Sequence, residues 1–170
     1  MSRLFAVVAP DFRLAWMLPG AALLAGLTGI ALAMRETPMA ALGLLPVGLA
    51  AAVVGIALTR RRGELDGGEL RITAGINSRR IGVGALRPDE AAIVDLAERS
   101  ELRPFWRTFG TGLPGYRAGY YRLRNGAKAF VLVTDTRRVL ALPEQDGRLL
   151  LLSVAQPQAL LDAITSRTGR

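Results

Sequence analysis

Two long stretches without charge dominate the first third of the chain. Residues 14–34 and 37–59 contain no Asp, Glu, Lys or Arg. A helix of about 20 residues spans roughly 30 Å, the thickness of the hydrocarbon core of a bilayer. The pattern therefore predicts a transmembrane hairpin over residues 14–59, with one helix at 14–34 and the other at 38–59. The link between them is so short that the helices must run antiparallel as neighbours.

The cations near the ends of these helices predict how the hairpin is oriented. Two arginines precede the first helix and residues 60–62 are three consecutive arginines, whereas the link carries one arginine beside one glutamate. Cations are retained on the cytoplasmic side of a membrane. We therefore expect a membrane protein with both termini in the cytoplasm and residues 1–13 as a cytoplasmic or interfacial segment. A signal peptide cleaved near 31–33 is the alternative, and it leaves the later part of the chain on the same side.

After Gly68 the hydrophobic period shortens to two, which is typical of half-buried strands. Residues 60–68 are charged and end in two glycines, and we interpret them as a linker. Asn125-Gly126 is a strong signal for a hairpin turn, and Pro157 suits the first turn of a C-terminal helix at 157–166. Predicted strands lie at 70–73, 79–83, 91–96, 103–109, 119–123, 128–134 and 137–142, with 148–154 as a further candidate.

This order of elements predicts the fold class. About seven short antiparallel strands followed by one helix indicate a mainly-β domain at residues 69–167. Such a domain forms a bent antiparallel sheet or partly open barrel, with the helix closing one end. The chain would then combine a membrane α-hairpin with a single mainly-β domain.

Two residue types are absent from the chain, and their absence restricts its chemistry. There is no cysteine and no histidine. Disulfides, thiolate nucleophiles, metal sites built on either residue and serine–histidine catalysis are therefore excluded. We expect no catalytic residues, no metal and no cofactor, and we expect that the protein is not an enzyme.

A glycine-rich stretch at 110–115 matches the G-x-G-x-x-G pattern of dinucleotide-binding sites. Such a site requires that the glycines open a helix. Here a strand pattern follows, so nucleotide binding is not expected. The glycines are instead expected to permit tight bends, because glycine adopts positive φ without strain. These structural glycines are Gly110, Gly112, Gly115 and Gly119.

The chain is strongly basic, with a net charge of +8 at pH 7, of which +7 falls on residues 60–170. A basic domain beside a membrane is attracted to anionic headgroups, so weak contact with anionic lipid is one expectation. Only one of the 22 cations is a lysine. A compositional preference for arginine is therefore an alternative explanation of the positive charge. We favour a solvated basic face over a specific phosphate pocket. Nucleic acid is not expected as a partner. The candidate lipid- or partner-binding residues are Arg79, Arg80, Arg107, Arg117, Arg122 and Lys128.

The stretch RTFGTGLPGYRAGYY at 107–121 resembles the signature of bacterial pleckstrin-homology-like (PH-like) domains. The strands AFVLVTD at 129–135 and VLAL at 139–142 are similar to later strands of that family, and QPQALL at 156–161 stands where the family helix begins. Gln156 replaces the usual aspartate, and a leucine replaces the usual aromatic residue of that helix. The resemblance covers residues 70–164 and implies the PH-like fold and a binding or scaffolding role, without a reaction.

These observations together predict a membrane-anchored binding or scaffolding module at the cytoplasmic face of the bacterial inner membrane. Its expected partners are another membrane protein or further copies of itself, and anionic lipid. The alternative is an accessory subunit that modulates a transporter or membrane enzyme through its hairpin. Ala21, Ala25 and Gly29 recur every four residues on the first predicted helix. Small residues in such a stripe let helices approach closely in lipid, which the alternative would require.

Overall fold

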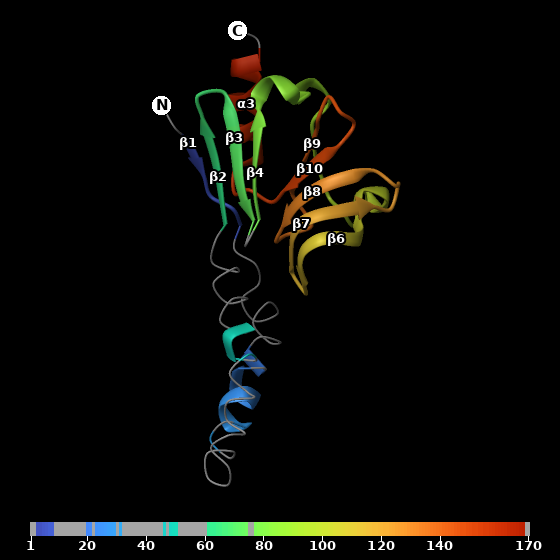
Figure 1. The fold of residues 1–170 in the computed structure, drawn as a ribbon. Coiled ribbons are helices and arrows are strands. Elements are labelled where there is room, and N and C mark those ends of the chain that lie inside the picture. The colour runs from blue at the N-terminus through green and yellow to red at the C-terminus, as the bar shows by residue number, and fades with distance from the viewer. Residues whose placement is uncertain are drawn as a thin grey trace.

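The computed structural model describes residues 3–8, 20–21, 23–29, 31, 46, 48–50, 61–74 and 77–168. Within these residues the strands form two sheets, whose strand directions cross steeply (Figure 1). The first sheet is antiparallel throughout, in the order β1-β2-β3-β4. Its strands are β1 (Arg3–Phe5), β2 (Arg61–Asp66), β3 (Glu69–Ala74) and β4 (Asn77–Gly82).

The second sheet has the order β5-β9-β10-β8-β7-β6. Its pairs are antiparallel except β10 with β8, which are parallel, so the expectation of a wholly antiparallel sheet was wrong. The β9–β10 hairpin inserts its second strand beside β8, and this places two strands of the same direction next to each other. The strands are β5 (Ala92–Val94), β6 (Pro104–Leu113), β7 (Tyr116–Leu123), β8 (Lys128–Val133), β9 (Val139–Pro143) and β10 (Leu149–Leu152).

The central strands of the second sheet are apolar on both faces, because both faces are buried. On the inner face, Phe130, Leu140 and Leu150 pack with residues of the first sheet. On the outer face, Val131, Val139 and Leu151 pack with side chains from the segment between β5 and β6. Each fully buried side chain of this size stabilises the fold by about 1.5–3 kcal/mol. This double burial explains why these strands show continuous apolar runs instead of alternation.

One α-helix and three short 3₁₀-helices complete the domain in the part of the chain that the structure describes. The C-terminal helix α3 (Pro157–Thr168) buries Leu160 and Ile164 against the inner core, so the predicted helix at 157–166 is confirmed. Three short 3₁₀-helices lie in the connections between β4 and β6. They are η1 (Val83–Ala85), η2 (Pro88–Glu90) and η3 (Ser100–Leu102).

The N-terminal segment belongs to the domain. In β1, Phe5 pairs with Gly63 of β2. The chain then crosses to the second sheet, where the Val8 amide donates to the Ser153 carbonyl at 3.0 Å and the Ala155 amide donates to the Ala6 carbonyl at 2.8 Å. Residues 3–8 therefore join the two sheets.

Two of the predicted boundaries change as a result. Residues 1–13 were expected to be a separate cytoplasmic or interfacial segment, but residues 3–8 form β1 and its continuation. Residues 60–68 were expected to be a linker, but 61–66 form β2 and the two glycines that follow form its turn, with φ of 55° and 88°. The domain thus begins before 69, because β2 pairs along its whole length with β3.

Most of the predicted transmembrane hairpin lies outside the described residues. Within 14–34 and 38–59, the structure describes 20–21, 23–29, 31, 46 and 48–50, and these residues are helical. Among the described residues, no helix is long and apolar enough to cross a membrane.

Candidate functional site

The β6–β7 hairpin bends sharply where two glycines face each other. Gly110 and Gly119 are cross-strand partners and have φ of 132° and 122°. A Cβ on Gly110 would lie 2.1 Å from the Ala118 carbonyl oxygen, and one on Gly119 would lie 2.3 Å from the Phe109 carbonyl oxygen. A side chain at either position would collide with the facing strand, so these two glycines set the path of the backbone at the bend.

The other two glycines of the predicted set act differently. Gly115 lies in the turn of the hairpin with φ of 70°. Gly112 has no positive φ, but a Cβ there would lie only 3.0 Å from the Tyr121 hydroxyl oxygen and 3.6 Å from Nη1 of Arg107. Its missing side chain therefore leaves room for polar groups of the neighbouring residues.

Register shifts in β6 decide which side chains share a face. They occur between Pro104 and Trp106 and between Arg107 and Phe109. Such bulges add a residue to one strand and increase the local twist. As a result Trp106 pairs with Arg122, and Phe109 pairs with Tyr120, on the same face of the sheet.

We call this face the aromatic–basic surface. Trp106 is 68% exposed, Phe109 59% and Tyr120 37%, although all three are large and apolar. Tyr120 also contacts the core, since its ring meets that of Phe130 edge to face at 5.1 Å. The surface consists of Trp106, Phe109, Tyr120, Arg122 and Lys128, and it borders the open edge of the sheet at β6.

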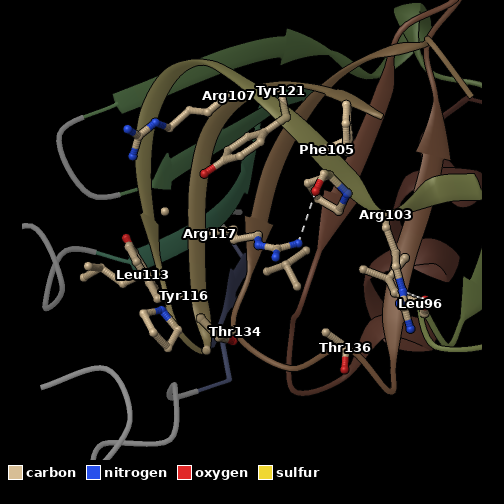
Figure 2. A pocket seen from close by; sticks show the side chains of 15 residues that line it. Leu96, Arg103, Phe105, Arg107, Leu113, Tyr116, Arg117, Tyr121, Thr134 and Thr136 are labelled. Carbon is tan, nitrogen blue, oxygen red and sulfur yellow. Dashed lines mark hydrogen bonds between the residues drawn. The ribbon is translucent and has the colours of Figure 1, made fainter. Parts of the chain in front are cut away.

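The opposite face of the same hairpin forms a pocket of about 710 Å³. Arg103, Arg107 and Arg117 line it together with Tyr121 and Thr134. Figure 2 shows Arg117 in the middle of the pocket, with Arg107 and Tyr121 on one side and Arg103 on the other. The site thus collects three cations from β6, β7 and the residue just before β6.

Backbone carbonyls hold two of these arginines in place. Nη1 of Arg117 donates to the Pro104 carbonyl oxygen at 3.2 Å, and Nε of Arg103 donates to the Leu96 carbonyl oxygen at 2.5 Å. The Tyr121 hydroxyl donates to the Thr111 carbonyl oxygen at 2.7 Å. Burial raises the pKa of Tyr121, and the positive charges of Arg107 and Arg117 partly oppose this shift. The hydroxyl therefore stays protonated at neutral pH and remains a donor.

Arg79 does not belong to a lipid-binding surface. Its Nη1 and Nη2 donate to Oε1 and Oε2 of Glu144 at 2.8 and 2.7 Å, and its side chain is only 12% exposed. Its guanidinium carbon also lies 5.9 Å from the centre of the Phe130 ring. The two neighbours Arg79 and Arg80 point to opposite faces of β4, since Arg80 is exposed and pairs across the strands with Arg71. The pair therefore cannot act as one basic site.

The structure divides the predicted candidates among several places. Arg107 and Arg117 meet in the pocket, Arg122 and Lys128 lie on the aromatic–basic surface, and Arg80 lies on the first sheet. The sequence-based reasoning did not identify the aromatic residues of the aromatic–basic surface, Arg103 or Tyr121 as candidate site residues. The signal for two of these aromatic residues was present in the sequence, as bulky apolar side chains on both sides of Arg107 in 105–109.

The described residues offer no group of three or more carboxylates close enough together to hold a metal ion. Comparison with curated proteins and comparison with solved structures each gave no significant match. A family model described as Bacterial PH domain matches residues 61–168, which include every strand from β2 onward and α3. The chain therefore belongs to the Bacterial PH domain family.

Proposed function

We propose that this protein is a membrane-anchored docking module. In this proposal the PH-like domain lies at the cytoplasmic face of the bacterial inner membrane and holds a protein partner or a second copy of the chain. Its role is binding and scaffolding, without catalysis. The observation that carries the proposal is the aromatic–basic surface.

Large apolar side chains gathered on one exposed face are unusual for a domain that works alone. Trp106, Phe109 and Tyr120 are exposed on adjacent strands, and Arg122 stands beside them. Tryptophan, tyrosine and arginine are the residues that most often dominate the binding energy of protein interfaces. The composition of this surface therefore suits a protein partner better than solvent.

The open edge of β6 adds a second means of contact. Among the residues that the structure describes, β6 is one of the two outer strands of the second sheet, and it runs over ten residues. An exposed strand edge presents unpaired backbone groups to which another strand can add. The register shifts at 104–109 restrict such pairing to part of the strand. The edge thus gives a partner a backbone contact beside the aromatic side chains.

The pairing of β1 with β2 supports a two-span anchor. Phe5 of β1 pairs with Gly63 of β2 in antiparallel register, so the C-terminal end of β1 lies beside the N-terminal end of β2. A segment that leaves and returns on one side of a bilayer crosses it an even number of times. The two uncharged stretches and the flanking arginines fit this requirement, with both termini cytoplasmic.

The accessory-subunit role remains the alternative. Because β1 precedes and β2 follows the two predicted helices in the chain, a partner of the hairpin would also influence the domain. Exchange of residues 14–59 for an unrelated two-span hairpin distinguishes the two roles. The docking module keeps its partner after this exchange, whereas the accessory subunit loses it.

Photo-crosslinking in native membranes tests the docking role. We expect a benzophenone amino acid at Phe109 to give one defined protein adduct, with the mass of a second copy or of one partner. The additional change Trp106→Ser should abolish this adduct. The same photoreactive group at Arg138, an exposed residue between β8 and β9, is the control and should not give it. Adducts only with lipid, or identical adducts from both positions, would contradict the proposal.

A further inference from the structure

The pocket behind the aromatic–basic surface gathers positive charge without a compensating carboxylate. Its lining includes Arg103, Arg107 and Arg117 but no aspartate or glutamate. None of these three arginines takes part in an ion pair among the described residues. Three neighbouring cations repel one another, and a bound anion would relieve that repulsion.

The arginines are oriented but retain donors for a ligand. A guanidinium has five N–H donors. Arg117 uses one on the Pro104 carbonyl oxygen at 3.2 Å, and Arg103 directs two to the carbonyl oxygens of Leu96 and Ala97. The side chain of Arg107 makes no hydrogen bond to the described residues. Most of the N–H groups of the cluster are therefore available.

The space for a ligand is built into the backbone of the hairpin. The bend at Gly110 and Gly119 curls β6 and β7, and Gly112 lacks the Cβ that would lie 3.0 Å from the Tyr121 hydroxyl and 3.6 Å from Nη1 of Arg107. A side chain at residue 112 would occupy the region near both groups. The volume of about 710 Å³ lies in the range of small-molecule sites. Apolar side chains such as Leu113 complete the wall.

We propose that this pocket binds a phosphate group carried by a larger molecule. The planar forks of several guanidinium groups match the oxygens of a phosphate and hold it by charge-assisted hydrogen bonds. The apolar wall would contact the rest of the ligand. This assignment replaces our preference, based on sequence, for a merely solvated basic face around Arg107 and Arg117.

Two sources of this phosphate chemistry are compatible with the pocket. The hydroxyl of Thr134, which lines the pocket, donates to the Val8 carbonyl oxygen at 2.7 Å. Residue 8 precedes the predicted membrane helix by only six positions, and an extended chain covers at most about 3.6 Å per residue. A lipid headgroup is therefore within reach, and a soluble phosphate ester is the other source.

The inference does not rest on the docking surface, because the two sites lie on opposite faces of β6 and β7. Its test can use the full chain in dodecyl maltoside, a detergent without phosphate. The probes are inorganic phosphate and dihexanoyl phosphatidic acid, each titrated at constant ionic strength against chloride. The readout is the NMR signals of the arginine Nε–H groups, with the Tyr120 and Trp106 signals as a record of the other face.

We expect saturable shifts at Arg107 and Arg117 with at least one probe. Arg107→Gln or Arg117→Gln should weaken the apparent affinity by about tenfold, as loss of a charge-assisted fork predicts. Arg138→Gln removes the same charge from an exposed site outside the pocket and should change the affinity less than twofold. Tighter binding of the lipid probe would identify a headgroup as the ligand, and equal binding would identify a soluble ester.

A second variant guards against a loss of binding that results only from misfolding. Thr136→Glu adds a carboxylate to the exposed rim of the pocket without removing a buried group. We expect it to compete for the guanidinium groups and to reduce binding of phosphate while the melting temperature stays unchanged. The proposal is overturned if neither probe gives saturable shifts, if chloride gives the same shifts, or if Arg138→Gln weakens binding as much as Arg117→Gln.

Discussion

Arg79 and Glu144 form a two-pronged ion pair that ties β4 of the first sheet to the end of β9 in the second. The two N–O distances are 2.8 and 2.7 Å, and the residues are 65 positions apart in the chain. Burial raises the pKa of the Glu144 carboxyl, and the charge of Arg79 acts against that shift. This arginine therefore holds a buried carboxylate between the sheets, which explains why it is not available to lipid.

Removal of Arg79 should destabilise the domain in a pH-dependent way. Breaking one side of a buried pair costs about 3 kcal/mol, and we expect this loss for Arg79→Met at pH 7.5. A raised pKa means that the folded state holds the Glu144 proton more tightly than the unfolded state. The stabilisation that comes from this difference in the pKa of Glu144 is therefore fully present below the pKa of the unfolded state. It is lost as the pH rises through the pKa of the folded state. In Arg79→Met the pKa of Glu144 rises further, because the opposing charge of Arg79 is gone. A larger fraction of Glu144 is then protonated at pH 5 than at pH 7.5, so the loss of stability should be smaller at pH 5.

Pulse proteolysis of the detergent-solubilised chain in urea measures this stability at both pH values. The matched control is Arg80→Met, which removes an exposed cation from the adjacent position. The double variant Arg79→Met with Glu144→Leu should recover most of the stability at pH 7.5, because no unpaired charge remains. Equal losses for Arg79→Met and Arg80→Met would contradict this account of the ion pair.

Substitution of Gly119 should show how much the bend in the β6–β7 hairpin depends on glycine. In Gly119→Ala the new Cβ would lie 2.3 Å from the Phe109 carbonyl oxygen, at a φ of 122° that other residues rarely adopt. We expect a loss of about 3 kcal/mol or more in the free energy of unfolding. Gly82→Ala is the control, since a Cβ there meets nothing within 4 Å, and it should change stability by about 0.5 kcal/mol or less. Similar melting of both variants would show that the bend tolerates side chains.

The attachment of the N-terminal segment should depend on Thr134. Its hydroxyl donates to the Val8 carbonyl oxygen at 2.7 Å, and Thr134→Val removes this bond, which is worth about 1 kcal/mol. We expect hydrogen exchange at the Val8 and Ala155 amides to become about fivefold faster, because both amides join this segment to the second sheet. Thr136→Val, at an exposed position, should leave both rates unchanged. Unchanged exchange in Thr134→Val would indicate that the segment is held by its backbone bonds alone.

Local patterns predicted much of the fold. Alternation and turn residues located the β3–β4 pair, β7, β8 and the C-terminal helix, because each of these elements has a local sequence signature. The segment 61–66 reads as a charged linker in isolation. It is a strand because it pairs with β3 on one side and with residues 3–5 on the other, and the paired residues of the latter lie 58 to 62 positions away.

The candidate site was predictable only in part, for a related reason. Arg107 and Arg117 were singled out as cations near a glycine-rich turn, but that spacing does not tell which face each occupies. The faces are set by the register shifts in β6 and by the bend at Gly110. Arg103 and Thr134 join the pocket from other parts of the chain, which only the folded sheet brings together. Arg79 and Arg80 looked like one basic pair, yet a strand turns adjacent side chains to opposite faces.

We predict that both ends of the transmembrane hairpin meet the domain on the cytoplasmic side of the membrane. Because the chain has no cysteine, single substitutions can be labelled without background. We would measure labelling of Glu36→Cys, in the predicted link, and Ser78→Cys, exposed on β4, by a membrane-impermeant maleimide in bacterial spheroplasts. We expect labelling of Glu36→Cys in intact spheroplasts and of Ser78→Cys only after lysis. Labelling of Ser78→Cys before lysis, or of Glu36→Cys only after lysis, would contradict it.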